Sequence, residues 1–311
     1  MRFGVWELAV SPLRVSFAGL KLDNPLSLAS GIAGVTVATL ARAVESGAGA
    51  AVSKSIGLEP RKGYRSPTLV ATDSGLLNAV GLANPGARIF SEELSAVRGR
   101  RLPIIVSIFG GGPVEFARVA EILDGNEFLA YELNLSCPHV EGVGTEIGHD
   151  PEVVASVVKA VRARTQKPIF AKLSANTHRM VEVATAAVDS GADGLTAINT
   201  VRAMEIEVET GRPVLDHKFG GLSGDAIRPI ALARVYELYE KVKVPILGCG
   251  GVSTWEHAVE MMLAGASAVE VGTALYEGYG VFNKINRGIE EYMKRKKHRR
   301  VQDMVGLGHK F

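Results

Sequence analysis

One pattern repeats along most of the chain: a short apolar segment, a loop, and an amphipathic segment of helical length. This alternation is typical of strands and helices that build a parallel sheet. Eight strand–helix units of this kind predict an α/β protein of the (β/α)8 TIM-barrel class. The alternative is an open, doubly wound sheet, which is disfavoured because no GxGxxG motif follows the first strand. The eight expected strands cover residues 26–29, 50–54, 104–108, 129–135, 169–173, 194–198, 246–248 and 268–271.

Two local signals mark the boundaries of these units. A small residue followed by Gly-Ala closes a helix just before a strand, where glycine can adopt a positive φ. Pro-Ile opens a strand, because the first residue of a strand need not donate to the ladder. The first signal occurs at Ser46-Gly47-Ala48, Ser190-Gly191-Ala192 and Ala264-Gly265-Ala266, and the second at Pro103-Ile104, Pro168-Ile169 and Pro245-Ile246.

The remaining segments are expected at the two ends of the barrel. Residues 13–22 alternate apolar and polar around Ala18-Gly19, which predicts an N-terminal β-hairpin over the closed end. Residues 55–85, 136–150 and 200–224 are long insertions after the second, fourth and sixth strands. Because all three follow strand ends on one face, they predict a lid and a binding wall over the mouth. No linker is visible, so residues 1–311 are expected to form a single domain.

Composition favours a globular enzyme. The 311 residues are 47% hydrophobic, carry a net charge of +2 and include only two cysteines, in no metal-binding spacing. Few cysteines suit a reducing compartment, and with no signal peptide or membrane-length apolar stretch we expect a cytoplasmic protein without a structural metal. The basic run at residues 294–300 is interpreted as a solvated helix end rather than a nucleic-acid site.

A thiol is expected at the catalytic face. The apolar run that ends at Leu135 stops at Ser136-Cys137-Pro138, and a glycine-rich segment follows. Loops after barrel strands carry the chemistry, and a thiol there can act as a general base if water is excluded. The alternative is a small buried cysteine. Cys249 is interpreted as such a small filler.

Late glycines and strand-end polar groups suggest what binds there. Glycine-rich turns are expected at residues 220–224 and 248–251 and at Gly272-Thr273, where barrels commonly bind phosphate through backbone amides. Lys54 and Lys172 end apolar strands, and a buried lysine is normally paired with an anion such as a carboxylate or a reduced flavin. Neutral donors and acceptors on the same rim suit a planar substrate: Asn78, Asn134, Asn199 and Thr200.

Taken together, these motifs resemble the class-one dihydroorotate dehydrogenases, FMN-containing (β/α)8 barrels of pyrimidine (UMP) synthesis. The resemblance covers nearly the whole chain and rests on Leu58-Glu-Pro-Arg-Lys-Gly63, Leu77-Asn-Ala-Val-Gly-Leu82, Asn134-Leu-Ser-Cys137-Pro, Gly220-Gly-Leu-Ser-Gly224 and Gly250-Gly251.

The resemblance implies a role for each matching residue. Cys137 is the implied base that removes the C5 proton of dihydroorotate while C6 passes a hydride to flavin. The implied substrate contacts are Lys54, Asn78, Ala79, Val80, Gly81, Leu82, Asn134, Asn199 and Thr200. The implied FMN contacts are Ser30, Lys54, Ser55, Asn134, Lys172, Ile198, Gly224, Gly250, Gly251, Gly272 and Thr273, with Lys172 beside the negative end of the reduced ring.

The motifs look most like the NAD-linked subclass, which implies a partner subunit carrying FAD and an iron–sulfur cluster around a homodimeric core. A fumarate-reducing homodimer is the alternative. The family usually has Asn where this chain has His139, a substitution also seen in dihydropyrimidine dehydrogenases. An enzyme acting on uracil-type rings is therefore one alternative function. A flavin-free phosphate-binding barrel, either a lyase or a regulatory binding module, is another.

Overall fold

The computed structural model describes residues 11–136 and 147–311, and its centre is a closed barrel of eight parallel strands. Each strand is hydrogen-bonded to two neighbours, in the order β10-β15-β16-β3-β4-β7-β8-β9 and back to β10. The predicted TIM barrel is confirmed, and the open sheet is wrong. The barrel strands are β3 (Leu26–Leu28), β4 (Ala50–Val52), β7 (Ile104–Ile108), β8 (Ala130–Asn134), β9 (Ile169–Leu173), β10 (Gly194–Ala197), β15 (Ile246–Cys249) and β16 (Ala268–Val271).

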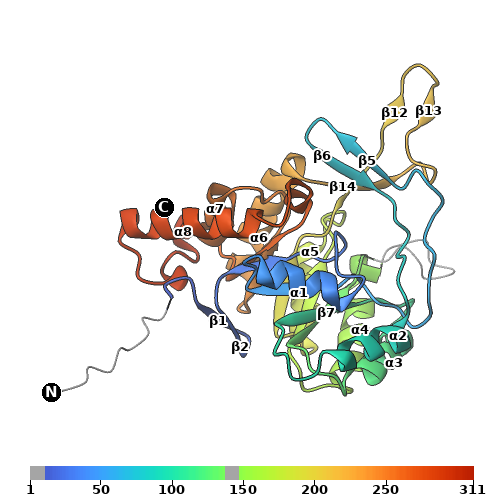
Figure 1. Cartoon of the computed structure of the whole chain (residues 1–311), viewed down its shortest axis with the longest axis horizontal. Helices are drawn as coiled ribbons and strands as arrows, with labels where there is room; N and C mark the ends of the chain where they lie inside the picture. Colours follow the sequence, from blue (N-terminus) through green and yellow to red (C-terminus); the bar gives the residue numbers. More distant parts are fainter. Residues whose placement is uncertain (1–10, 137–146) are drawn as a thin grey trace.

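An α-helix follows every barrel strand and packs around the outside (Figure 1). In the fourth helix, residues Val154, Val157, Val158 and Val161 are buried, which is the i, i+3, i+4, i+7 stripe of a helix lying on a sheet. Asp150 caps the same helix by accepting a hydrogen bond from the backbone of Glu152. The helices are α1 (Val37–Glu45), α2 (Ala87–Ala96), α3 (Pro113–Leu123), α4 (Pro151–Arg162), α5 (Met180–Asp189), α6 (Arg228–Lys241), α7 (Trp255–Leu263) and α8 (Val281–Lys296).

The expected unit boundaries are confirmed. Strands begin at Ile104, Ile169 and Ile246, directly after the three prolines. The three glycines that end helices have φ between +105° and +123°, which only glycine adopts without strain: Gly47, Gly191 and Gly265. The second strand is shorter than expected and ends at Val52, so Lys54 lies just beyond it.

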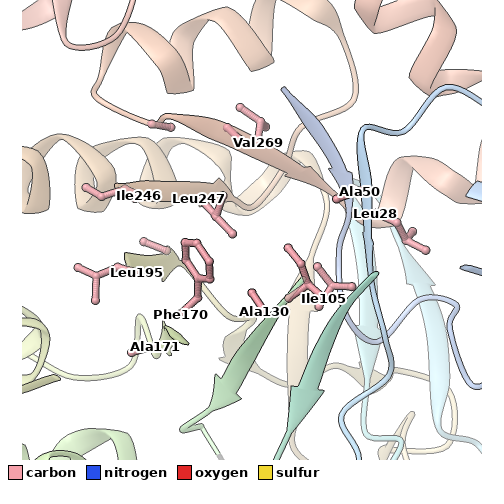
Figure 2. Packing of buried hydrophobic residues seen from close by; sticks show 14 of the residues in the cluster. Leu28, Ala50, Ile105, Ala130, Phe170, Ala171, Leu195, Ile246, Leu247 and Val269 are labelled. Carbon is pink, nitrogen blue, oxygen red and sulfur yellow. The ribbon is translucent and has the colours of Figure 1, made fainter. Parts of the chain in front are cut away.

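The hairpin of β1 (Val15–Phe17) and β2 (Leu20–Leu22) covers the N-terminal end of the barrel, as predicted. The ring of Phe17 packs edge-on against Phe170, with centroids 6.1 Å apart. Phe170 is the second residue of β9 and belongs to the same apolar cluster as Ala130 on the neighbouring β8 and Ile105 on β7 (Figure 2). The apolar core thus fills the lower barrel and leaves the polar side chains near the mouth.

Strands inside the long loops form a second sheet. The loop after β4 contributes β5 (Leu69–Thr72) and β6 (Gly75–Asn78), and the loop after β10 contributes β11 (Val201–Ala203) and β14 (Gly220–Ser223). They pair in the order β11-β14-β6-β5, a sheet that we call the roof, and the hairpin β12 (Ile206–Glu207) and β13 (Arg212–Pro213) projects beyond it (Figure 1). The expected glycine-rich turn at residues 220–224 is therefore wrong for 220–223, which are a strand.

Short 3-10 helices complete the described chain: η1 (Ile147–His149), η2 (Asp225–Ile227), η3 (Thr273–Glu277), η4 (Val301–Asp303) and η5 (Leu307–Lys310). The basic run begins in the last turn of α8, where most of its side chains are exposed. None of the helices in residues 11–136 and 147–311 is both long and apolar enough to cross a membrane.

Candidate active site

A cavity of about 850 Å3 opens between the C-terminal ends of the barrel strands and the roof. Every predicted site residue within the described chain lines it: Ser30, Lys54, Ser55, Asn78, Ala79, Val80, Gly81, Leu82, Asn134, Lys172, Ile198, Asn199, Thr200, Gly224, Gly250, Gly251, Gly272 and Thr273. Cys137 and His139 lie outside the described residues. Ser136, which precedes Cys137, lines the cavity, and its buried Oγ has no hydrogen-bond partner among the residues that the structure describes.

Polar side chains from five strand ends form one hydrogen-bonded network on the floor of this cavity. The Oγ atom of Ser55 lies 3.0 Å from that of Ser107 and 3.5 Å from that of Ser30. Asn134 donates to Ser55 at 3.0 Å, and its own Oδ1 accepts from Asn199 at 3.2 Å. Because each side chain is fixed by another, the amides are held ready for a planar ligand that carries both donors and acceptors.

Lys54 brings a cation to the cavity. Its Nζ donates to the carbonyl of Gly31 at 3.3 Å, and it forms no salt bridge with the residues that the structure describes. Burial lowers the pKa of Lys54. A partly desolvated ammonium without a carboxylate partner is well suited to an anionic ligand group.

The roof places Asn78 and Thr200 together. Asn78 donates to the carbonyl of Gly221 at 3.0 Å, across the β6–β14 ladder. A Cβ atom on Gly221 would lie 2.0 Å from Thr200 Oγ1, so only glycine fits there. This packing explains why residues 220–221 are glycines although they form no phosphate turn.

The later glycines give the opposite wall a surface of bare backbone. Gly250 and Gly251, after β15, have φ of +129° and +70°. A Cβ on Gly251 would lie 2.5 Å from the Cβ of Arg228, so the loop packs tightly on the start of α6. Thr273 follows β16, where it starts η3 and donates to Ser223 at 2.9 Å. Backbone beside short helix starts is the kind of surface that receives a phosphate group.

Lys172 is the centre of a charged group that the sequence prediction missed in part. Its Nζ lies 3.3 Å from Glu132 Oε2 and 2.9 Å from Glu270 Oε2. We call Glu132, Lys172 and Glu270 the buried ionic triad, since their side chains are 0%, 6% and 0% exposed. Each glutamate stands between apolar residues of a buried strand, and that interruption was the available signal in the sequence.

The triad has unusual protonation equilibria. The two carboxylates raise the pKa of Lys172 against the opposing effect of burial, which keeps the ammonium charged. Burial raises the pKa of Glu270 to about 8, and the negative charge of Glu132 acts in the same direction. Cys249 also lines the cavity, and burial raises the pKa of its thiol, so it is a small, neutral neighbour of the triad.

The fold and the cavity define a (β/α)8-barrel enzyme whose site lies at the C-terminal mouth, with a floor of amides, a buried ammonium and a backbone wall. A family model described as "Dihydroorotate dehydrogenase" matches residues 12–293. The chain therefore belongs to the dihydroorotate dehydrogenase family.

Three relatives illustrate the similarity. The chain is 50% identical over 301 residues to the protein of Pyrococcus furiosus, covering 96% of this chain and 99% of the relative. It is 46% identical over 292 residues to that of Methanocella arvoryzae, covering 94% and 96%. It is 43% identical over 302 residues to that of Archaeoglobus fulgidus, covering 96% and 100%. All three relatives are named "Dihydroorotate dehydrogenase B (NAD(+)), catalytic subunit".

Proposed function

We propose that this chain is the catalytic subunit of a two-component dihydroorotate dehydrogenase that oxidises dihydroorotate to orotate in pyrimidine synthesis. The observation that carries the proposal is that all described site residues expected from the resemblance line one cavity of about 850 Å3. Full-length identity of 43–50% to catalytic subunits of the NAD-linked enzyme supports the same activity. In this proposal residues 1–311 act as one domain.

FMN is the proposed cofactor, and the cavity has features that fit it. One end of the cavity carries polar side chains, which suit the flavin ring. The other end exposes backbone amides, which suit a terminal phosphate. At the ring end Lys172 would face the pyrimidine part of the flavin, with Ser30, Ser55, Asn134 and Ile198 around it. At the other end Gly224, Gly250, Gly251, Gly272 and Thr273 would hold the phosphate. Bound there, FMN supplies the hydride acceptor.

The proposed substrate contacts lie between the floor and the roof. Lys54 would pair with the substrate carboxylate, because it is a desolvated cation without a described salt bridge. Asn134, Asn199 and Thr200 would bind the polar edge of the ring, with residues 78–82 closing the site from the roof. Cys137 is the proposed base for the C5 proton. Ser136 supports this placement, since it precedes the thiol in sequence and lines the cavity.

A partner subunit is part of the proposal. The relatives are catalytic subunits of an NAD-linked enzyme, which implies a separate subunit for transfer of electrons to NAD. We propose that this partner carries FAD and an iron–sulfur cluster and that a homodimer of the present chain forms the core of a heterotetramer. A cytoplasmic location belongs to the same proposal and is supported by the low cysteine content, which suits a reducing compartment.

Anaerobic titration of the purified protein tests the proposal. We expect a yellow protein whose flavin absorbance is bleached by dihydroorotate and not by dihydrouracil. Bleaching by dihydrouracil instead would assign the chain to uracil-type substrates, and a colourless protein that takes up no FMN would refute both. Recovery of colour with NAD only when an iron-containing partner is present would support the two-component arrangement, whereas recovery with fumarate alone would contradict it.

A further inference from the structure

The charge balance of the buried ionic triad requires one more proton. With both carboxylates ionised, Lys172 leaves Glu132 and Glu270 with a net charge of −1 inside the barrel, where their side chains have no exposure. An uncompensated buried charge is strongly unfavourable, so such groups bind or release a proton instead. A single proton on either carboxyl would make the triad neutral.

Glu270 is the better proton carrier of the two. Its Oε2 accepts from Lys172 at 2.9 Å, whereas its buried Oε1 has no hydrogen-bond partner among the described residues. Lys172 approaches both oxygens of Glu132, at 3.4 and 3.3 Å. The ammonium therefore shares its charge between both oxygens of Glu132 but contacts a single oxygen of Glu270, whose other oxygen can carry a proton.

The neighbours of Glu270 do not provide a competing charge. Cys249 on β15 is its register partner, and the raised pKa of that thiol keeps it neutral. Ser27 on β3 is the register partner on the other side and does not titrate in this range. Of the described residues, Glu132 and Lys172 are thus the charged groups that determine the protonation of Glu270. Burial and Glu132 hold its pKa near 8.

We propose that Glu270 is a proton-carrying positioning residue, which keeps the triad neutral and binds its proton more tightly when negative charge develops on the cavity side of Lys172. The proposal rests on the proposed flavin site. Oxidation of dihydroorotate releases two electrons and two protons. One proton leaves with both electrons as the hydride, and the base takes the other. With FMN held beside Lys172, this transfer would add one negative charge on the cavity side of the lysine, and at alkaline pH Glu270 would bind one further proton from solvent.

The protonated carboxyl can be tested without any flavin. The infrared spectrum of the full-length protein should contain the C=O stretch of a buried carboxylic acid, lost as pH rises through about 8. Glu270→Gln should abolish this band. Glu132→Gln should abolish it near neutral pH as well, because one cation then balances one carboxylate. Absence of the band in the parent protein, or its persistence in Glu270→Gln, would overturn the proposal.

The link to the flavin is tested by the midpoint potential of the FMN-loaded protein between pH 6 and 10. Above about pH 8 the parent should bind one more proton per two electrons than Glu270→Gln does. Its potential should therefore fall by about 30 mV per pH unit more steeply than that of the variant. Below pH 8 the two slopes should agree, since Glu270 is then protonated in both redox states.

A matched variant and a second acidic position separate the possible outcomes. Glu277→Gln removes a negative charge at the exposed rim of the same cavity and should leave the slope as in the parent. Glu132→Gln should flatten the slope like Glu270→Gln, which covers the case that one variant fails to fold. Equal slopes in the parent and in both triad variants would overturn the redox role. If the protein takes up no flavin, the proposed function and the redox role fail together, and the infrared result alone decides whether the triad holds a protonated carboxyl.

Discussion

The Nζ atom of Lys172 lies 2.9 Å from Oε2 of Glu270, although their strands, β9 and β16, are not neighbours in the barrel. The contact therefore crosses the interior, and it is completed by Glu132 from β8. Lys172, which lies near the mouth, thus links strands that are not adjacent in the barrel.

Replacing Lys172 by Met should strongly destabilise the protein. It leaves two carboxyl groups buried without their cation, and breaking a buried pair in this way costs about 3–5 kcal/mol. Urea denaturation at pH 7 measures the change in unfolding free energy. The triple variant, which combines Lys172→Met with Glu132→Gln and Glu270→Gln, should recover much of the lost unfolding free energy, because no charged side chain of the triad remains. Equal stability of the single variant and the parent would show that solvent reaches the triad.

Glu270 should make the parent less stable as pH rises. Its pKa is about 8 in the folded protein and 4.5 in the unfolded chain, so the folded state holds the extra proton between these values. Over that range the unfolding free energy should fall by up to about 1.4 kcal/mol per pH unit and then level off. Unfolding curves at several pH values should show that Glu270→Gln gains stability relative to the parent from pH 5 to 8. Parallel pH profiles would contradict the raised pKa.

Replacing Gly221 by Ala should damage the roof and the substrate site together. The new Cβ would lie only 2.0 Å from Thr200 Oγ1. Residue 221 cannot move away easily, because its strand is paired with β6. We expect a higher KM for dihydroorotate, by roughly tenfold if one polar contact worth about 1.4 kcal/mol is lost. Gly280→Ala is the control, because its Cβ meets nothing within 4 Å and its φ is −61°. Similar KM values in the two variants would show that Thr200 does not contribute to substrate binding.

Replacing Cys137 by Ala should leave flavin binding intact and slow the reductive half-reaction. Loss of a positioned general base typically reduces the rate by 10²–10⁴-fold, roughly. Stopped-flow reduction of the flavin by dihydroorotate measures this step directly, with the absorbance spectrum as the check on cofactor content. A near-normal reduction rate in a fully loaded variant would remove the thiol from the mechanism.

Replacing Phe17 by Ala tests whether the two ends of the barrel act separately. Phe17 is 7% exposed and packs on Phe170 at the closed end. Truncation of a buried aromatic side chain costs about 3–5 kcal/mol. Thermal unfolding should show this loss, whereas the KM of the folded enzyme for dihydroorotate should be unchanged. A changed KM would indicate that the hairpin influences the mouth through the core.

The sequence predicts the barrel well because its signals are local. Pro-Ile strand starts, glycine helix ends and apolar runs each lie within a few residues, and all eight strands were expected in the correct places. The pairing that joins the two insertions into the roof escaped prediction because it is not local: Gly221 faces Asn78, which is 143 residues away. Gly220–Ser223 also lacks the alternation of apolar and polar residues that marks a half-buried strand.

The sequence predicted the site residues that belong to a recognisable motif. It did not predict the residues whose role depends on a partner across the barrel. Lys172 was expected to face an anion, and the structure provides two protein carboxylates for that purpose. A lone glutamate in a buried strand marked both positions. The sequence did not show which cation each glutamate would contact, because the arrangement of the strands in the barrel, and not distance along the chain, brings Glu270 to Lys172.

The roof also has a consequence for engineering and for evolution. Because β6 and β14 pair with each other, each of the two long insertions supplies a strand partner to the other. A chimaera that takes only the β4 insertion from a relative would replace one partner of this ladder, whereas exchanging both insertions as a set would keep the two partners together. Two stretches of the gene that lie far apart thus have to encode matching strands at this entrance.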